Sequence, residues 1–330
     1  MQIEHIISHV LDTVSNNYIP ADALTNIDNE HINEFVSSKL IKTFSTNLRK
    51  TSFFQKESRC LAEVKSYLDH SISFIELSQH YAKRLFDLKM EIGIYEITSL
   101  LIAQVVYEQR RYLIGIDQGI KNGITYYVDF QSENKNELIE QAILSPNLLK
   151  NDFVFCIELS DFELHVIEQK REIQSMSCEI LTQKFLQATA KPSYDEAYKA
   201  IETISKQMVE KYEMDPIEIL PKVKKQIKTS FDAQEVIETD EIAHTIFEKV
   251  PLAVADFKSE VEKAGISKKI QTENCKMKKT MKTQKIVTDT KVEITFPVEM
   301  MDNPNLFEIW HQSDGTISIT LKNITSIQNR

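Results

Sequence analysis

The sequence predicts an α+β fold, with an N-terminal mixed domain of antiparallel sheet and helices and a C-terminal helical region that ends in a small antiparallel β element. Three observations favour this class. Over the first half of the chain the apolar pattern is extended, then helical, then extended again. A second block of helical periodicity follows after about residue 190, and alternating apolar residues return near the C-terminus.

The N-terminal elements begin with a strand from Ile3 to Leu11, which is apolar and rich in β-branched residues. Three helices are expected next. The first has Asp28 as N-cap and apolar residues at every fourth position, namely Ile32, Val36, Leu40, Phe44 and Leu48. The second covers about residues 57–68, and the third begins with a capping box formed by Ser73 and Glu76.

From Ile97 the period becomes extended. Three strands are predicted, at residues 97–107, 112–116 and 124–130. Asn122-Gly123 is interpreted as the last turn, because both residues tolerate positive φ. A short helix is expected at about 137–144. The apolar runs 153–159 and 162–167 then flank a two-residue link, which predicts a tight hairpin.

The composition shifts after about residue 170, and we place the domain boundary within residues 170–190, giving domains 1–175 and 176–330. The capping box of Ser193 and Glu196 opens the first helix of the second domain. Three further helical pieces follow, punctuated by Pro216, Pro221 and Pro251. Alternation at 292–296 and a Ser-Asp-Gly turn at 313–315 predict the terminal β element.

Length and composition place limits on the class of protein. With 330 residues, 42% of them hydrophobic, the chain can form a buried core without disulfide bonds. The cysteines lie far apart and form no CxxC pair, which argues against disulfides and zinc and favours a reducing cytoplasm. No apolar run approaches the roughly twenty residues of a membrane span, so no membrane partner is expected. A net charge of −10 confines any nucleic-acid contact to a local patch.

Motifs for catalysis or cofactors are not found. The spacing of Gly115, Gly119 and Gly123 fits neither of the phosphate-binding patterns GxGxxG and GxxxxGK[ST]. These glycines are therefore predicted to lie in hairpin turns. His5 and His9 lie four apart without the glutamate of a zinc helix, and histidines that serve structure are expected. No nucleophile elbow is present. We therefore predict a binding protein rather than an enzyme, with no catalytic residue, no metal ligand and no cofactor.

One segment is strongly basic. Between residues 268 and 285 a single acid, Glu273, stands against seven lysines: Lys268, Lys269, Lys276, Lys278, Lys279, Lys282 and Lys285. The local charge is +6. If the chain is extended after Cys275, Lys276, Lys278 and Lys282 project to one side, and Met277, Lys279 and Met281 project to the other. Such a stripe can follow phosphates. The alternative is a solvated loop or an edge strand protected by lysines. A lesser patch on a helix, Lys222, Lys224, Lys225 and Lys228, is more typical of a solvated face.

Three stretches together resemble the bacterial nucleoid-associated protein family of NdpA, also called YejK. They are IEHIISHVLD at residues 3–12, the block 96–117, and NLFEIWHQSDGTISI at residues 305–319. The resemblance runs nearly end to end. It implies a cytoplasmic protein of the nucleoid that binds double-stranded DNA, and that in some members contacts type II topoisomerase subunits and changes their activity. The family contributes no residue-level DNA-binding motif, so the lysine stripe depends on charge alone.

Three functions stay open on the sequence. The first is a nucleoid-associated protein that binds double-stranded DNA through phosphates with little sequence preference. The second is a protein-interaction adaptor whose acidic surface is the working face. The third is a metal-dependent nuclease built on carboxylates such as Asp152, Glu158, Asp161 and Glu163. A homodimer is a further expectation, since apolar strands such as residues 100–106 can pair across a two-fold axis.

Overall fold

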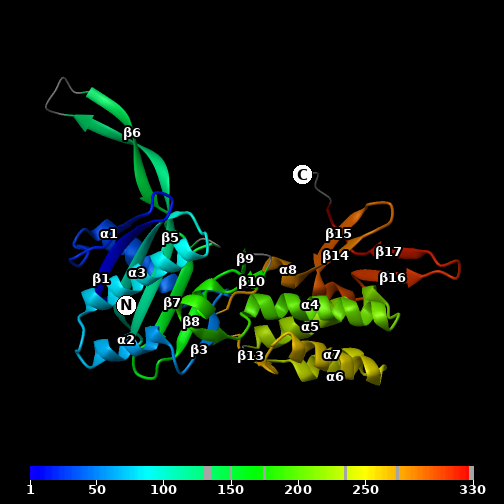
Figure 1. Cartoon of the computed structure of the whole chain (residues 1–330). Helices are drawn as coiled ribbons and strands as arrows, with labels where there is room; N and C mark the ends of the chain where they lie inside the picture. The colour runs from blue at the N-terminus through cyan, green and yellow to red at the C-terminus, as the bar shows by residue number, and fades with distance from the viewer. Residues whose placement is uncertain (130–134, 149–150, 174–175, 234–235, 273–274, 327–330) are drawn as a thin grey trace. The chain divides into compact units, whose positions relative to one another are not determined.

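The computed structural model describes the whole chain except residues 130–134, 149–150, 174–175, 234–235, 273–274 and 327–330. The chain divides into two compact units, Met1–Ser193 and Tyr194–Arg330. The first combines a large antiparallel sheet with helices, and the second is helical before it ends in small antiparallel hairpins (Figure 1). The predicted α+β class is confirmed.

The first unit is built on one antiparallel sheet. Its described strands are β1 (Gln2–Asp12), β2 (Asn17–Ile19), β3 (Lys50–Phe54), β4 (Ile97–Tyr107), β5 (Arg110–Asp129), β6 (Lys135–Leu144), β7 (Phe153–Glu158), β8 (Leu164–Ile167) and β11 (Ala188–Ala190). Their order is β11-β3-β8-β7-β5-β4-β1-β2, while β6 pairs with β5 alone. A separate hairpin joins β9 (Arg171–Ile173) to β10 (Met176–Cys178).

Helices cover both faces of this sheet. On one face lie α2 (Arg59–Leu68), α3 (Phe74–Glu91) and the π-helix η1 (Ile180–Phe185), and on the other lies α1 (Glu30–Lys42). In β7, Phe155 packs with Tyr81 of α3, whereas Val154 and Cys156 pack with Leu40 of α1. Because successive residues meet different helices, both faces of β7 are buried, which explains its continuous apolar sequence.

The helix starts follow from side-chain caps. The capping box of Ser73 and Glu76 is present at the start of α3, as predicted. The first helix is capped by Asn29 rather than Asp28, because the Asn29 Oδ1 accepts hydrogen bonds from the backbone N–H groups of His31 and Ile32. It ends at Lys42, so the predicted apolar positions Phe44 and Leu48 lie beyond it. The second begins at Arg59, because Ser58 caps it.

The region between residues 110 and 144 differs from the prediction in two ways. The predicted strands 112–116 and 124–130 are parts of the single strand β5, and Asn122-Gly123 lies inside it, paired with Ala142 and Gln141. Phe130 itself lies outside the described residues. The segment 137–144 is part of strand β6 rather than a helix, because each of its residues is paired with a residue of β5.

Two predictions about larger organisation also change. The segment 176–193, which the sequence assigned to the second domain, belongs to the first unit. It contributes the buried side chain of Phe185 and strand β11, which pairs with β3. The strand with residues 100–106 is not an edge, because β4 is paired with β1 on one side and β5 on the other. It has no free edge for pairing across a two-fold axis.

Four helices form the core of the second unit: α4 (Tyr194–Lys211), α5 (Pro216–Asp232), α6 (Thr239–Phe247) and α7 (Pro251–Lys263). Pro221 lies inside α5 instead of between helices. The two-stranded pair β12 (Ile237–Glu238) and β13 (Lys269–Ile270) is followed by the short helix α8 (Lys279–Lys282).

The C-terminal β element consists of two hairpins. The first joins β14 (Thr283–Val287) to β15 (Glu293–Pro297), and the second joins β16 (Phe307–His311) to β17 (Ile317–Leu321). The 3-10 helix η2 (Val298–Asp302) lies between them in sequence. Gly315 adopts a φ of +85° in the second turn, which confirms the predicted hairpin there.

Candidate nucleic-acid interface

The lysine-rich stretch, residues 268–285, is called the lysine segment below. All seven of its lysine side chains are exposed. It is not the single extended stripe that was predicted, because residues 279–282 form the helix α8. The reason lies in its two methionines, since Met281 is buried and Met277 is partly buried against the core of the second unit. The lysines are therefore divided among the surroundings of β13, α8 and β14.

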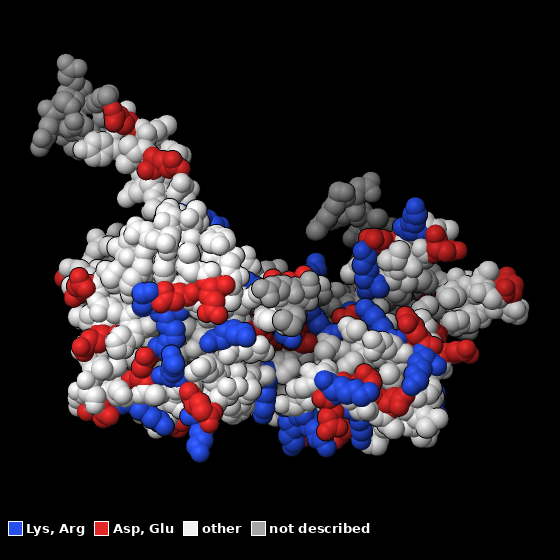
Figure 2. Space-filling view, viewed as in Figure 1, with Lys and Arg blue, Asp and Glu red and all other residues white. Residues whose placement is uncertain are grey.

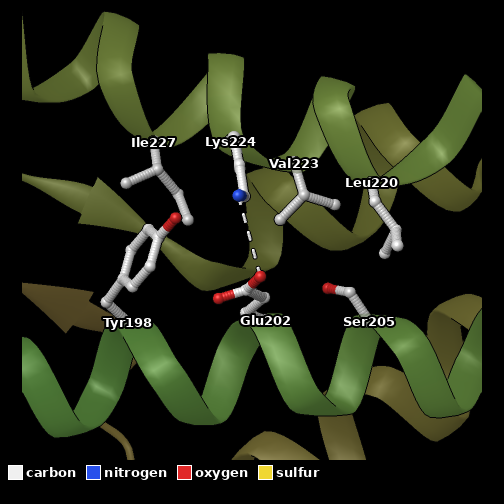
Figure 3. A pocket seen from close by; sticks show the side chains of 7 residues that line it. All are labelled: Tyr198, Glu202, Ser205, Leu220, Val223, Lys224 and Ile227. Atoms are coloured by element: carbon white, nitrogen blue, oxygen red, sulfur yellow. Dashed lines mark ion pairs between the residues drawn. The ribbon is translucent and has the colours of Figure 1, made fainter. Parts of the chain in front are cut away.

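Helix α8 is held in place by a lysine of α5. The Lys224 Nζ donates hydrogen bonds to the backbone oxygens of Thr280 and Thr283, at 3.3 and 3.2 Å. The same ammonium pairs with Glu202 of α4 at 3.7 Å. Figure 3 shows this side chain reaching from α5 toward Glu202, across a small pocket that Tyr198 also lines. Lys224 thus satisfies carbonyl groups at the end of α8 and ties the lysine segment to the helical core.

The lesser lysine patch on α5 is neutralised by carboxylates. Its ion pairs join Lys222 to Glu218, Lys224 to Glu202, Lys225 to Asp302, and Lys228 to both Asp232 and Glu299. A phosphate would have to displace a carboxylate at each of these positions. This arrangement favours the solvated-face interpretation that the sequence suggested for the patch.

The lysine segment is only partly neutralised. Lys269 pairs with Glu238 at 3.0 Å, Lys285 pairs with Glu293 at 2.8 Å, and Lys278 pairs with Asp195. In contrast, Lys268, Lys279 and Lys282 make no ion pair with any described residue. These three are therefore the cations most readily available to an external anion. Elsewhere, on the face drawn in Figure 2, blue and red side chains are interspersed.

The sequence does not reveal the partners of the paired lysines. Asp195, Glu238 and Glu293 all lie outside the lysine segment in sequence, and the fold brings them to it. The positions of the lysines in the sequence do not predict which carboxylates they contact. These carboxylates cancel part of the segment's charge of +6. The net positive charge at this surface is therefore smaller than the sequence alone suggests.

The two N-terminal histidines serve the fold. His9 is fully buried on β1, where its Nδ1 accepts a hydrogen bond from the Ala21 N–H at 3.0 Å, and burial lowers its pKa to about 4. The His5 ring packs on Phe74 at 5.3 Å. Neither histidine belongs to a group of three metal-ligating side chains within the described part of the chain.

Three of the four carboxylates considered for a nuclease lie together. Glu158, Asp161 and Glu163 can bring one oxygen each within 4.8 Å of one another, whereas Asp152 is separate from them. Arg110 pairs with Glu158 at 3.0 Å, and the His165 Nε2 lies 3.0 Å from a Glu163 oxygen. The protein thus already supplies a cation to this group. Glu158 is buried and the other two carboxylates are exposed, and an acidic cluster of this kind does not by itself identify a metal site.

The two buried cysteines have no nucleophilic setting. All four are free thiols, and Cys60 and Cys156 are buried. Burial raises the pKa of each of these two thiols to about 12, which keeps them protonated and unreactive at neutral pH.

The comparison with known families decides the relationship that the three stretches suggested. The family model described as nucleoid-associated protein YejK matches residues 7–328. The chain belongs to this family. No individual curated protein matches the sequence. Membership of the YejK family supports a nucleoid-associated role for the protein. This family is not a known enzyme family. Among the described residues, no helix is both long and apolar enough to cross a membrane.

Proposed function

We propose that this YejK-family protein binds double-stranded DNA through backbone phosphates, with little sequence preference, and that the lysine segment makes the contact. The observation that carries the proposal is the exposure of all seven lysines of the segment in a protein of net charge −10. Lysine acts on phosphate mainly as a point charge, and phosphate contacts provide affinity without reading sequence. Family membership supports DNA as the ligand.

The ion pairs indicate which lysines are most available to contact phosphates in this proposal. Lys268, Lys279 and Lys282 come first, because they pair with no described carboxylate. Lys269 and Lys285 come next, since their partners Glu238 and Glu293 are themselves exposed, and exposed ion pairs contribute only about 0–1 kcal/mol. Both lysines can therefore exchange a carboxylate for a phosphate.

Lys278 is expected to contribute least. Its partner Asp195 is only 4% exposed, so moving the ammonium away would weaken the compensation of a buried charge. On α8 itself, Lys279 and Lys282 are three residues apart and lie on one side of the helical turn. These two form the centre of the proposed contact.

The test is a salt titration of duplex binding. The triple variant Lys268→Glu, Lys279→Glu, Lys282→Glu is expected to bind more weakly and to flatten the slope of log affinity against log salt by about 3, because each phosphate contact contributes about 0.9 to that slope. Binding is measured by fluorescence anisotropy with two duplexes of unrelated sequence, which should behave alike.

The control makes the same change in charge elsewhere on the second unit. Lys206, Lys222 and Lys263 are exposed and already pair with carboxylates three or four residues away. Their triple change to Glu should leave the slope close to that of the unaltered protein. Equal slopes in all three proteins would remove the lysine segment from the proposal.

Contact with a type II topoisomerase and modulation of its activity form the second part of the proposal. The resemblance implies this partner. The net charge of −10 also favours binding to a partner with a basic surface over one with an acidic surface. A pull-down with purified topoisomerase subunits, after nuclease treatment, tests for direct contact. Capture that disappears when DNA is digested would show that DNA alone joins the two proteins. Capture that survives, without duplex binding by this protein, would favour the adaptor function instead.

A further inference from the structure

A second group of unpaired cations lies on the first unit, where the end of β3, the start of α2, the end of η1 and β11 meet. Its members, called the edge cluster below, are Lys56, Arg59, Lys184 and Lys191. All four side chains are exposed, and none makes an ion pair with a described residue. The sequence does not reveal this group, because its two halves lie far apart in the chain.

Gln187 joins the two halves of the edge cluster. Its carbonyl accepts a hydrogen bond from the N–H of Gln55 at 2.9 Å, and its side-chain Oε1 accepts one from the N–H of Arg59 at 2.8 Å. Lys56 directly follows Gln55, and Lys184 lies three residues before Gln187. Three of the four cations are therefore held around one residue.

Lys191 extends the edge cluster along β11. This strand pairs with β3 on one side only, so it is a free edge of the sheet. The Lys191 N–H donates to the Thr51 carbonyl at 2.9 Å, and its ammonium lies 5.3 Å from the centre of the exposed Phe53 ring. The cations thus lie at both ends of β11, with Arg59 and Lys184 near its start and Lys191 after its end.

Few carboxylates accompany these cations. Within residues 53–59 and 183–191 there are four cations and one acid, Glu57, which leaves a charge of +3. Glu179, just before η1, is already engaged by the buried Lys50 at 2.9 Å. An exposed cation without a carboxylate partner can contact a phosphate without first breaking an ion pair. The edge cluster therefore fits an anionic partner.

Helix α2 places Arg59 where the helix dipole disfavours positive charge. The first turn of α2 contains no acidic residue, whereas the first turns of α1, α3, α4, α5 and α6 all contain one or more. The N-terminal end of a helix has a partial positive charge, so a cation there lowers stability. Folding alone does not explain a cation at this position, whereas an anionic ligand does.

Protection of a free strand is the other common use of cations at a sheet edge. It accounts for Lys191, which directly follows β11, but Lys56, Arg59 and Lys184 lie on neighbouring elements. A peptide strand added to β11 would find only three residues to pair with, which is shorter than a typical strand. Phosphate groups need no such pairing. The observations therefore favour a nucleic-acid backbone over a peptide strand.

We propose that the edge cluster is a second surface that contacts the backbone phosphates of duplex DNA, with Lys56, Arg59 and Lys184 at its centre. The identity of the ligand rests on the proposed function, whereas the location does not depend on the lysine segment. The two surfaces belong to different compact units. One chain therefore has two phosphate-contacting surfaces, which hold either one duplex together or two duplexes separately.

Duplex titrations of full-chain variants test the edge cluster. The variant Lys56→Gln, Arg59→Gln, Lys184→Gln removes three charges without adding new ones. If both surfaces hold one duplex, the slope of log affinity against log salt should flatten by about 3, since each phosphate contact contributes about 0.9. If each surface holds its own duplex, the number of duplexes bound per chain should fall from two to one. An unchanged slope together with an unchanged stoichiometry would overturn the proposal.

The matched control makes the same change in net charge on the second unit. It changes Lys206, Lys222 and Lys263 to Gln, and these lysines already pair with carboxylates. Slope and stoichiometry should both stay at the values of the unaltered protein. A control that weakens binding as much as the edge-cluster variant would show that net charge alone is responsible, and would also overturn the proposal.

The single variant Arg59→Glu separates loss of binding from loss of folding. The helix dipole favours an acid in the first turn of α2, so the melting temperature should stay the same or rise. Binding should nevertheless weaken, either with a slope flatter by about 1 or with weaker binding of one of the two duplexes. Undiminished binding, or weaker binding that a fall in melting temperature explains, would remove Arg59 from the proposed surface.

The lysine-segment variant of the proposed function belongs in the same series of titrations. Weaker binding by both variants supports both surfaces. An effect of the edge-cluster variant alone would keep this inference and remove the lysine segment from the proposed function. An effect of the lysine-segment variant alone would keep the proposed function and overturn this inference.

Discussion

The buried ammonium of Lys89 shows how a single residue can set the stability of the first unit. Its side chain is fully buried at the end of α3, where the Nζ lies 2.5 Å from Asp117, 3.0 Å from Glu96 and 3.0 Å from the Thr98 hydroxyl. Asp117 is itself buried. The Asp117 carboxylate is shielded from bulk water, so it depends on the Lys89 ammonium for compensation.

The change Lys89→Ala is expected to destabilise the protein by about 3–5 kcal/mol, because it leaves the Asp117 carboxylate buried without its cation. Urea unfolding followed by circular dichroism measures the difference. Lys83→Ala on the same helix is the control, since its pair with Asp87 is exposed and contributes about 0.5 kcal/mol or less. Similar losses in both variants would contradict the role of burial.

His9 makes stability depend on pH. Its pKa in the folded protein is about 4, whereas the unfolded chain has the ordinary value of 6.5. Between these values the unfolded state binds a proton that the folded state does not, so the folded state loses stability as pH falls from 6.5 toward 4. The loss from this residue is at most about 1.4 kcal/mol per pH unit.

The variant His9→Gln should therefore lose less free energy of unfolding than the unaltered protein between pH 6.5 and pH 5. Urea denaturation at several pH values in this window provides the comparison. The free energy at pH 7.5 is read in the same series, so that the static effect of the substitution is separated from the titration. Parallel pH profiles for the two proteins would mean that another group causes the acid sensitivity.

At the scale of elements, two glycines of β5 provide a matched pair. A Cβ on Gly115 would lie 2.1 Å from the Phe155 ring, which is buried between the sheet and α3, whereas a Cβ on Gly119 would meet no atom within 4 Å. Gly115→Ala is expected to cost about 1–3 kcal/mol through overpacking. Gly119→Ala should stay within about 0.5 kcal/mol of the unaltered protein. Thermal melts compare the two, and equal melting temperatures would be inconsistent with this packing.

The elements that pack against a core could be predicted from the sequence. The elements that do not pack against a core could not be predicted in this way. The apolar run 153–159 and the capping box at Ser73 were identified because burial on both faces and a specific hydrogen-bond pair leave local patterns. The segment at about 137–144 is predicted as a helix, and Leu138, Ile139, Ala142 and Ile143 do have helical spacing, but it is part of strand β6. No core sorts these exposed side chains into alternating faces, so pairing with β5 decides the structure.

The candidate site shows the same limit. The sequence is sufficient to locate the lysine segment, because charge is a property of composition. It does not separate Lys279, which has no ion pair with a described residue, from Lys278, whose partner Asp195 lies 83 residues away. The sequence also does not show that Met281 is buried, and this burial is what converts the expected extended stripe into a helical turn. Long-range contacts decide both outcomes.

At the scale of the whole molecule, each hydrophobic cluster lies within one unit. The clusters around Phe155 and Leu40 belong to residues 1–193, and the cluster around Phe257 belongs to residues 194–330. Each unit thus has the buried apolar surface that independent folding requires. Because segment 176–193 adds Phe185 and strand β11 to the first unit, its presence should decide whether an N-terminal fragment folds.

The fragment 1–193 is therefore expected to unfold cooperatively in urea, as is the fragment 194–330. The shorter fragment 1–175 should be much less stable or unfolded, because it exposes the cluster that Phe185 and Leu181 complete. Circular dichroism and the sharpness of the urea transition measure both properties. Equal stability for 1–175 and 1–193 would show that the last 18 residues of the first unit are dispensable for folding.

The continuity of β5 has a consequence for how this molecule can change over evolution. The strand runs without interruption from Arg110 in the sheet to Asp129 in a two-stranded arm, in which residues 120–129 pair with β6. Successive residues of a strand face opposite sides. Insertion of one residue near position 120 would shift every later side chain to the other face. Insertions or deletions of two residues in each strand would lengthen or shorten the arm and keep Tyr126 on its present side. Among relatives, arm length should therefore vary in even steps.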